Sequence, residues 1–434
     1  MKRACTTAMI LVLVAAFAFG GGEQETAGAA GGQPVELRAT YWFAAPANME
    51  AVENATAEFN EEFPNATAVA EQIPYDTYWQ KIPAMAAAGQ LPDIVQIATI
   101  LKYTMGPTNA LYDLQEFIDN DPEMMRAWAD YLPGAKEAVK YEGQIIQLPY
   151  GYATSVLLYN REAFDEAGLD YPGEEYTWDD LLEDAQALTK RDENGIVTQW
   201  GFYKAGGMEG AHSGGIQNFI LQNGGTLMNE EGTEAYFDSA EAIEAVHFIN
   251  DMINTYEVMP SPTEAEGLGD LFEAGKAAIA HAGSWLLPQY KKACDFDWDI
   301  NHLPTHLEAA AIGDVGGAGF SMAKNTEAPE LAWEYLKKLN NYMAMHNARS
   351  GGEFPGDADL FDMWIEAEGP PYNRQNFADW TMTYGVARQI TPGYLQWRRE
   401  LGDEMVLIFN GEKSVEQGMQ DANRKINRIL REQN

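Results

Sequence analysis

The chain has 434 residues, with 66 Asp or Glu against 28 Lys or Arg, a formal net charge of −38 and 46% hydrophobic residues. This length and apolar content predict two or three globular domains with buried cores, not a mainly disordered chain. The acid excess excludes a nucleic-acid partner, because no basic stripe is available to displace phosphate counterions, and it disfavours anionic membrane surfaces.

The N-terminus has the pattern of an export signal. Lys2 and Arg3 precede an unbroken apolar run from Ala8 to Phe19. Because the run is shorter than the roughly 20 residues of a membrane span, we expect a signal peptide over residues 1–18 and an exported, periplasmic protein. Residues 19–35, rich in Gly and Ala, are expected to form a flexible tail.

Neither of the two cysteines is predicted to have a functional role. Cys5 precedes the apolar run and no Cys follows it, so a lipid anchor is not supported. Loss of the signal leaves Cys294 alone, which excludes an intramolecular disulfide. The neighbours Asp295 and Asp297 would raise the pKa of its thiol, so we predict packing and not reactivity.

Strand-like and helix-like segments alternate from about residue 35, which predicts α/β layers. The elements expected in the first half are a strand over 35–41, a helix over about 48–63 stopped by Pro64, a strand over 94–97, and a short helix capped by Asp113 with Glu116 in a capping box.

The apolar segment 145–160 is predicted to form two strands, because Pro149 and Gly151 interrupt it and Pro cannot donate in a central ladder. The helices expected after it start at Thr177 with Asp180 in a capping box, run over about 239–253 and 329–339, and follow Ser414 with Gln417 at the capping-box position.

Motifs for metal, nucleotide or hydrolytic chemistry are missing. His302 and His306 are four residues apart, but Pro304 prevents a shared helix face, so no metal site is predicted. His247 fits an apolar helical pattern and is predicted to pack in the core. The Gly-rich turn 313–319 matches no nucleotide fingerprint, and no G-x-S-x-G elbow occurs. Pairs of carboxylates suited to glycoside hydrolysis stay open, because acids are abundant.

Aromatic residues instead recur beside strand ends and glycines, where open α/β sheets bind ligands. They are Trp42, Phe43, Tyr75, Tyr78, Tyr150, Tyr152, Trp285, Tyr394 and Trp397. Aromatic faces suit the C–H faces of a sugar ring, and amide and carboxylate groups suit its hydroxyls. Each residue fits the core equally well. Trp285, which follows Gly283 and Ser284, is the strongest candidate.

Eight segments in one order carry a resemblance to a family. They are LPDIV from Leu91, LYDL from Leu111, LPYGYATSVLLYNREAFDEAGL from Leu148, YTWDDL from Tyr176, NGG from Asn223, FEAGKAAIAHAGSW from Phe272, VGGAGFSMAKNTEAPELAWEYLKKL from Val315, and NGEKSVEQGMQDANRKINRIL from Asn410. Over residues 36–431 the chain resembles the extracellular solute-binding proteins of ATP-binding cassette importers, in the sugar-binding group that includes maltose-binding protein.

This resemblance implies an α/β, two-lobed periplasmic-binding-protein fold of type II, with the ligand in a cleft between lobes joined by hinge strands. The N-terminal lobe would comprise residues 36–151 and 304–341, and the C-terminal lobe residues 152–303 and 342–434. The chain would cross between them at Pro149–Ala153, near Leu303–Pro304 and near Asn340.

Carried over by position, the ligand contacts of the family fall on Trp42, Phe43, Tyr75, Asp76, Thr99, Lys102, Tyr152, His212, Gln217, Trp285, Gly316, Gly317 and Trp397. Two acids that relatives use are missing. Ala98 and Thr99 stand where many place an Asp after the PDIV strand, and Ala153 stands where the maltose-binding type has an acid. This argues against a malto-oligosaccharide and leaves a sugar or sugar-like polar solute.

The resemblance implies a monomeric binding protein that closes on its solute and delivers it to the transmembrane permease subunits of an importer, without a cofactor, metal or catalytic residue. An exported glycosidase or lyase is the alternative. Delivery to a chemoreceptor would use the same binding chemistry and is not separated from transport by the sequence.

The charge can then be assigned to the exterior. Acids such as Glu183, Asp184, Glu241, Glu244 and Glu416 fall opposite apolar helix stripes, which predicts solvated faces. Without Lys2 and Arg3 the net charge becomes −40. We expect a protein adapted to a salty or alkaline exterior, where salt screens self-repulsion.

Overall fold

The structure is a computed structural model that describes residues 35–43, 46–131, 133–208, 214–306 and 314–433. The predicted signal peptide and nearly all of the predicted tail lie outside these residues. Val35–Asn434 forms one compact unit, which is described below. None of the helices in the described ranges has the length and apolar character that crossing a membrane requires.

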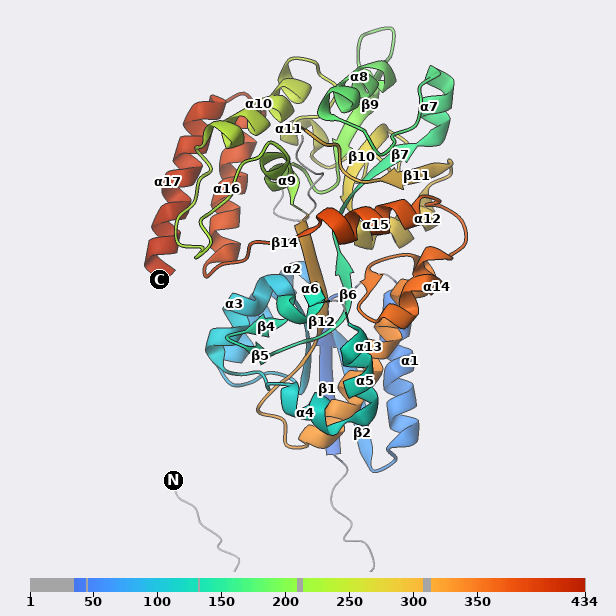
Figure 1. The fold of residues 1–434 in the computed structure, drawn as a ribbon, viewed down its shortest axis with the longest axis vertical. Coiled ribbons are helices and arrows are strands. Elements are labelled where there is room, and N and C mark those ends of the chain that lie inside the picture. Colours follow the sequence, from blue (N-terminus) through green and yellow to red (C-terminus); the bar gives the residue numbers. More distant parts are fainter. Residues whose placement is uncertain (1–34, 44–45, 132, 209–213, 307–313, 434) are drawn as a thin grey trace, which may run out of the picture. The chain divides into compact units, whose positions relative to one another are not determined.

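The first sheet combines segments from distant parts of the sequence. Its strand order is β13-β6-β12-β3-β1-β2, with β14 paired to β12. The bounds are Val35–Tyr41 (β1), Ala66–Gln72 (β2), Ile94–Ala98 (β3), Leu148–Ala153 (β6), Asp314–Met322 (β12), Phe354–Pro355 (β13) and Val386–Ala387 (β14). β1 is parallel to β2 and β3, whereas β12 is antiparallel to β3 and β6. Figure 1 shows orange β12 among blue and green strands.

Two helices cover one face of this sheet and bury its apolar side chains. They are α1 (Pro46–Glu62) and α13 (Pro329–Ser350), which contact each other and share a core with β1. Val52 and Phe59 of α1 and Leu336 of α13 belong to this core, and all three side chains are fully buried. Helix spacing of these apolar residues explains why both segments fold as helices.

The second sheet has the strand order β11-β7-β10-β9-β8. Its bounds are Ser155–Asn160 (β7), Lys190–Arg191 (β8), Val197–Lys204 (β9), Ala277–Gly283 (β10) and Trp298–Asn301 (β11). β10 is buried along its whole length, as expected of a strand covered on both faces. The larger helices that share its cores are α8 (Trp178–Leu188), α9 (Gly215–Gln222), α10 (Ala240–Asn254), α12 (Leu287–Ala293), α15 (Arg374–Tyr384), α16 (Tyr394–Phe409) and α17 (Val415–Gln433).

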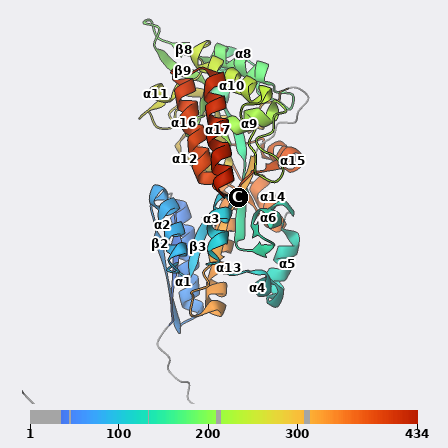
Figure 2. The same ribbon diagram turned by 90° about the vertical axis from the view of Figure 1, so that its left-hand side faces the viewer.

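The remaining helices and strands complete the fold. They are α2 (Tyr75–Ala87), η1 (Thr99–Leu101), α3 (Lys102–Met105), η2 (Gly106–Thr108), α4 (Gln115–Asn120), α5 (Pro122–Asp130), α6 (Pro133–Ala138), β4 (Lys140–Tyr141), β5 (Gln144–Ile145), α7 (Arg161–Ala167), α11 (Pro262–Ala265), η3 (Ser284–Leu286), η4 (Ala358–Leu360) and α14 (Phe361–Ile365). Figure 2 shows α16 and α17 side by side, in agreement with their contacts.

The chain passes directly from one sheet to the other between β6 and β7, and the break lies at Thr154. The predicted bend at Pro149 and Gly151 is therefore misplaced, since both residues lie inside β6. A register irregularity between Ala318 and Gly319 of β12 faces this part of β6. It lets the ladder accommodate the proline.

The crossing predicted near Asn340 is wrong. Asn340 lies in the middle of α13, which continues to Ser350, and its Nδ2 donates to the carbonyl of Pro149 at 3.2 Å. The helix ends at Gly351, which takes the left-handed conformation at φ 73°. The chain then pairs β13 with β6 and continues to α15, which contacts β11 of the second sheet.

The helix caps predicted from the sequence are confirmed in part. The Thr177–Asp180 capping box is confirmed, but Asp113 is not an N-cap. The N-cap of α4 is Leu114, and Asp113 instead accepts from the N–H groups of Gln115 and Ile145. At the last helix, Ser414 Oγ accepts from the N–H of Gln417 at 3.2 Å.

Two predictions about polar side chains are wrong. His247 is not in the core, since 44% of its side chain is exposed and its Nε2 lies 2.9 Å from Glu416. Asp184 does not lie on a fully solvated face. Burial raises its pKa to about 6, and it accepts a hydrogen bond from the Tyr176 hydroxyl at 2.8 Å.

Candidate functional site

The strand ends of the first sheet meet at one edge. Strand pairing sets Ala318 of β12 against Ala98 at the end of β3, Gly316 against Ala153 at the end of β6, and Phe354 of β13 against Tyr152. This edge is also where β6 leaves for the second sheet. The carboxyl edge of parallel strands is the usual place for a ligand in such sheets.

An aromatic cluster follows β1 at this edge. The ring of Trp42 lies 5.7 Å from Phe43, 5.3 Å from Tyr78 and 5.3 Å from Trp79. Tyr75, which is 37% exposed, meets Trp79 edge-on at 5.2 Å. The structure thus brings the predicted contacts Trp42, Phe43 and Tyr75 together. Sequence reasoning missed Trp79, although its spacing of four from Tyr75 on α2 signals a shared helix face.

Buried hydrogen bonds fix this cluster from beneath. The N–H of Trp42 donates to Gln96 Oε1 at 3.0 Å, and Gln96 Nε2 donates to the Tyr150 hydroxyl at 2.8 Å. Tyr78 donates to the carbonyl of Gln96 at 2.6 Å. Gln96, Tyr78 and Tyr150 are fully buried, so they position Trp42 and belong to the core.

Thr99 joins η1 to the glycines of β12. The N–H of Gly317 donates to Thr99 Oγ1 at 3.2 Å, and a Cβ on Gly317 would lie 2.9 Å from the carbonyl of Gly151. A Cβ on Gly316 would lie 3.5 Å from Cζ of Arg388, which sequence reasoning did not select. Gly317 therefore lets the backbone of β6 approach β12 closely, whereas a side chain at Gly316 would make only ordinary contact with Arg388 and Thr99.

Lys102 begins α3, next to this edge. Burial lowers the pKa of its ammonium, and Nζ lies 5.5 Å from the centre of the Tyr103 ring. Asp76 lies in the first turn of α2, and its side chain is outside the described residues, as is all of His212.

The second sheet contributes the segment that follows β10. The N–H of Thr154 donates to Ser284 Oγ at 3.3 Å, and the N–H of Ser284 donates to the Thr154 carbonyl at 2.9 Å. This pair connects the β6–β7 crossing to η3. Trp285 comes next, partly exposed, with its ring over Gly283, where an added Cβ would lie 2.2 Å from Cη2.

Helix α9 begins near the same crossing. Gln217 is 8% exposed, and the neighbouring Asn218 donates from Nδ2 to Ser155 Oγ at 2.8 Å. Ser155 is the first residue of β7. The predicted contact Gln217 thus lies on a helix that is fixed to the hinge.

Tyr152 and Trp397 are buried more deeply than predicted. Tyr152 is 6% exposed, packs in the core with Phe354, and has a buried hydroxyl without a hydrogen-bond partner. Trp397 is fully buried, packs edge-on against Tyr394 at 4.9 Å, and donates from Nε1 to Thr391 Oγ1. The prediction of Trp397 as a ligand contact is therefore corrected. The helix period of α16 directs this side chain into the core.

Glu353 is a second residue that sequence reasoning missed. It precedes β13 at the hinge edge, and its Oε2 is buried without a hydrogen-bond partner. Burial raises the pKa of its carboxyl to about 8. The sequence Gly-Gly-Glu-Phe-Pro contains no motif that would indicate a ligand contact. Glu353 reaches the hinge edge only because β13 pairs with β6.

Histidine and cysteine supply no metal centre within the described ranges, where no group of three or more potential ligands is found. His302 stacks on Trp380 at 3.5 Å and His306 on Trp178 at 4.2 Å. Burial, followed by Asp270, Glu273 and Asp295, raises the pKa of the Cys294 thiol to about 12. The direction agrees with prediction, although Asp297 is not among the causes.

A hollow of about 580 Å³ lies elsewhere, between α1 and α13. Its lining includes Glu50, Glu58, His346 and Arg349. None of the predicted ligand contacts borders it, so its size does not bear on the edge described above.

Comparison with known proteins identifies the family. The model of the bacterial extracellular solute-binding proteins matches residues 45–345. The chain belongs to this family. Curated relatives of this solute-binding protein include the arabinooligosaccharide-binding protein of Halalkalibacterium halodurans and a maltodextrin-binding protein of Bacillus subtilis. Each is 24% identical, over 68% and 67% of the chain and 65% and 66% of the relatives, so the chain spans about two thirds of their length.

A longer match is to the sn-glycerol-3-phosphate-binding periplasmic protein of Escherichia coli, 22% identical over 88% of the chain and 89% of the relative.

Solved structures agree on the fold. An ABC substrate-binding protein of Listeria monocytogenes in complex with cycloalternan has a TM-score of 0.81 and 24% identity, with 91% of this chain and 99% of that chain covered. A solute-binding protein of Thermotoga lettingae bound with α-D-tagatose has a TM-score of 0.77 and 23% identity, covering 91% and 100%. The chain thus has the predicted α/β, two-lobed type II periplasmic-binding fold.

Proposed function

We propose that the chain is the exported substrate-binding component of an ATP-binding cassette importer and captures a sugar or sugar-like polar solute. One observation carries this proposal: the aromatic cluster of Trp42, Thr99 and the glycines of β12 share the sheet edge at which the chain crosses to the segment of Trp285. The names of the relatives support it, since they are binding proteins for oligosaccharides or a polyol phosphate.

The proposed ligand contacts combine two kinds of chemistry. Trp42, Phe43, Tyr75 and Trp285 offer ring faces for the C–H surface of a sugar. Polar atoms of Thr99, Gln217 and Arg388 offer hydrogen bonds to hydroxyls. The contacts proposed from the first sheet also include Lys102, Gly316 and Gly317. Asp76 and His212 are still proposed as ligand contacts, on their position in the sequence alone. The mixture fits a small polar ligand held in a largely apolar pocket.

The proposed mechanism is hinge closure. The first lobe would comprise residues 36–151 and 304–341, extended through α13 to β13, which pairs with β6, together with β14, which pairs with β12. The second lobe would comprise the rest of the chain. Thr154 and Ser284 form the pivot that we propose, because their paired hydrogen bonds join the crossing to η3. Solute shifts the equilibrium toward closure only through contacts that are better in the closed state. The closed form would dock on the permease.

The remaining expectations stand as part of this proposal: an export signal at residues 1–18, a periplasmic location without a lipid anchor, and a monomer without a cofactor. The exported carbohydrate-active enzyme is not proposed, because the matched family and the relatives named above are binding proteins.

Calorimetry and tryptophan fluorescence test the proposal with a panel of D-glucose, D-tagatose, maltose, maltotriose, arabinotriose and sn-glycerol 3-phosphate. We expect at least one compound to give binding heat, a fluorescence change and compaction in X-ray scattering. Trp42→Ala should weaken this binding by about 10- to 100-fold, as for a central aromatic contact. Trp128→Ala, a partly buried tryptophan on α5, is the control.

Absence of both heat and compaction across the panel would overturn the sugar assignment. Chemical breakdown of the bound compound during long incubation would favour the enzyme instead.

A further inference from the structure

Glu353 lies at the sheet edge from which several of the ligand contacts are proposed. Pairing of Phe354 with Tyr152, and of Tyr152 with Gly317, sets the residue before β13 at the same sheet edge as Thr99 and Trp42. The ideal Cβ position on Gly151 lies 3.0 Å from both Cβ and Oε2 of Glu353. The glycine at the hinge strand therefore makes the room that this carboxyl occupies.

One oxygen of this carboxyl, Oε2, has no partner among the described residues. Oε2 is shut off from solvent and accepts no hydrogen bond, and burial is the cause of the raised pKa of about 8. A buried carboxylate without hydrogen-bond donors is costly, so the unliganded protein holds this group protonated at neutral pH.

The surrounding titratable groups do not compensate it. Arg374 of α15 lies beside Gly351 but donates to the carbonyls of Ala367, Gly369 and Pro370. Tyr150 of β6 is itself buried, and its pKa is raised first by burial and then by Glu353. The pKa of Tyr152 is raised by burial and by Tyr131. His346 and Arg349 of α13 line the separate hollow between α1 and α13, and α14, which also packs on β13, carries the acid Asp362.

Resting on the proposed function, we propose that Glu353 is a ligand-binding residue whose carboxylate accepts hydroxyl hydrogen bonds from the captured sugar, so that capture releases one proton to solvent. The reaction is balanced: the protonated carboxyl and free sugar become the carboxylate–sugar complex and a proton taken up by buffer. A sugar hydroxyl that donates to the carboxylate takes the place of the proton. The residue thereby supplies the acid that Ala98, Thr99 and Ala153 do not.

The sign of the pH dependence follows from this exchange. Below the pKa of free Glu353 the proton must leave before the sugar binds, so Kd falls as pH rises. The slope is at most about tenfold per pH unit, for one proton, and disappears above about pH 8. Glu353→Gln cannot ionise, so its Kd should be higher than that of wild type at pH 8 and nearly independent of pH.

Calorimetry on the full chain, with the compound of the panel that gives the strongest binding heat, provides the test. Titrations at pH 7 in buffers of different ionisation enthalpy should report release of close to one proton for wild type and for the control Glu241→Gln, an exposed acid on α10. Glu353→Gln should release none. A flat Kd from pH 6 to 9, a Kd that rises with pH, or equal proton release by Glu353→Gln would overturn the proposal.

A measurement without sugar separates this proposal from the proposed function. Infrared difference spectra of the unliganded protein between pH 6 and pH 9.5 should lose the carbonyl band of one protonated carboxyl in wild type but not in Glu353→Gln, with circular dichroism to verify folding of the variant. If no sugar binds but this band is present, the sugar assignment fails and the protonated state of Glu353 stands. If sugar binds and the band is missing, this inference fails alone.

Discussion

Gly283 shows how one residue can control the position of Trp285, a proposed ligand contact. It ends β10 with φ −90° and ψ 142°, a conformation that any residue can adopt. What excludes a side chain there is the Trp285 ring, because an added Cβ would lie 2.2 Å from Cη2. The indole lies against the backbone only because Gly283 has no side chain.

Gly283→Ala should displace the Trp285 ring while keeping the strand. We expect sugar affinity to fall by about tenfold, as for loss of one ring contact, and the free energy of unfolding to change by about 1 kcal/mol or less. Calorimetry measures the first and urea denaturation the second. Gly134→Ala, at a helix position with no neighbour within 4 Å, is the control. Unchanged affinity and unchanged tryptophan emission would contradict the role of Trp285.

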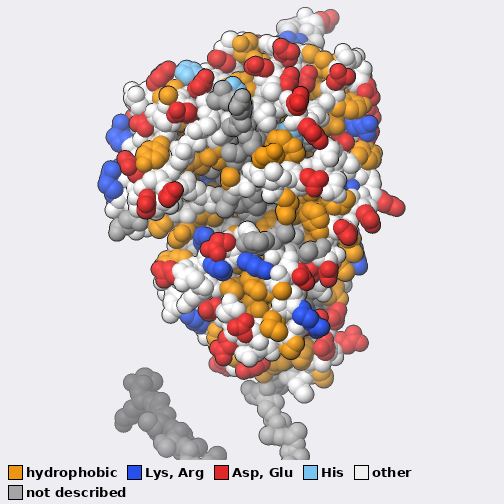
Figure 3. All heavy atoms as spheres, viewed as in Figure 1, with side chains coloured by type: hydrophobic (Ala, Val, Ile, Leu, Met, Phe, Trp, Pro, Cys, Tyr) orange, Lys and Arg blue, Asp and Glu red, His pale blue; other side chains and the backbone are white. Residues whose placement is uncertain are grey.

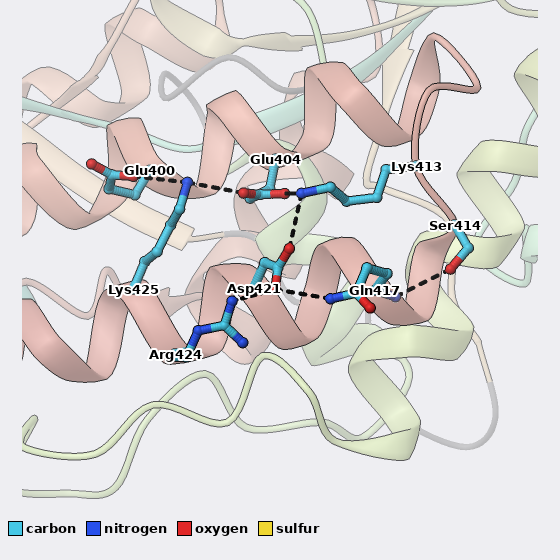
Figure 4. A network of polar contacts seen from close by, with 8 residues as sticks. All are labelled: Glu400, Glu404, Lys413, Ser414, Gln417, Asp421, Arg424 and Lys425. Carbon is cyan, nitrogen blue, oxygen red and sulfur yellow. Dashed lines mark hydrogen bonds and ion pairs between the residues drawn. The ribbon is translucent and has the colours of Figure 1, made fainter.

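At the scale of elements, α16 and α17 are joined by a network of charges (Figure 4). Glu404 of α16 has a side chain that is 3% exposed and pairs with Lys413 at 2.6 Å and Lys425 at 2.9 Å. Lys413 also meets Asp421 at 3.0 Å, and hydrogen bonds with Glu404 and then Asp421 raise its pKa. Glu404 is thus the buried acid that two partly buried lysines share.

Glu404→Gln should lower the free energy of unfolding by about 3 kcal/mol at pH 7, since it leaves two lysines without their buried counter-charge. The raised pKa of Lys413 gives stability that is present below its ordinary pKa and is lost as pH rises through the folded value, so the difference between variant and wild type should shrink above about pH 10.5. Urea denaturation at pH 7 and pH 11 measures both.

Arg424→Gln is the control for this network. Arg424 pairs with the same Asp421, but 69% of its side chain is exposed, so its loss should cost about 0.5 kcal/mol. If both variants were equally stable, burial of Glu404 would not be what makes the network matter.

Elements whose signals are local were predicted best. The Thr177–Asp180 box needs only residues within one turn, and β1 has the predicted bounds 35–41. The end of α13 was predicted too early, at Leu339, where the sequence has no stop signal. The stop signal is Gly351, which follows the last helical residue. The bend at Thr154 was also missed, since Pro149 stays inside β6 only through the register shift that leaves Tyr150 unpaired opposite Ala318 and Gly319 of β12.

At the scale of the whole molecule, the formal net charge of −38 is the dominant electrostatic feature. Figure 3 shows acidic side chains scattered over the visible face, not gathered at one place. Several are paired with lysines, as Glu58 is with Lys338 at 2.7 Å, but acids outnumber bases by more than two to one. Self-repulsion of this surface opposes the compact state at low salt.

Stability should therefore rise with salt. Between low salt and 1 M NaCl, where the Debye length falls to roughly 3 Å, we expect a higher Tm because repulsion between exposed acids is screened. Differential scanning calorimetry measures the shift, with sucrose at equal osmolality as the control for excluded volume. A Tm that does not increase in NaCl would contradict adaptation to a salty exterior.

The sequence by itself determined the α/β class, the alternation of segments and, through motifs in order, the family. These properties depend on composition, local periodicity and short segments. Only the tertiary structure placed Trp397 in the core, grouped Trp79 with Trp42, and brought Glu353 and Arg388 to the hinge edge. The reason is physical: strand pairing between residues about 200 positions apart decides which side chains share an edge, and no local pattern records that pairing.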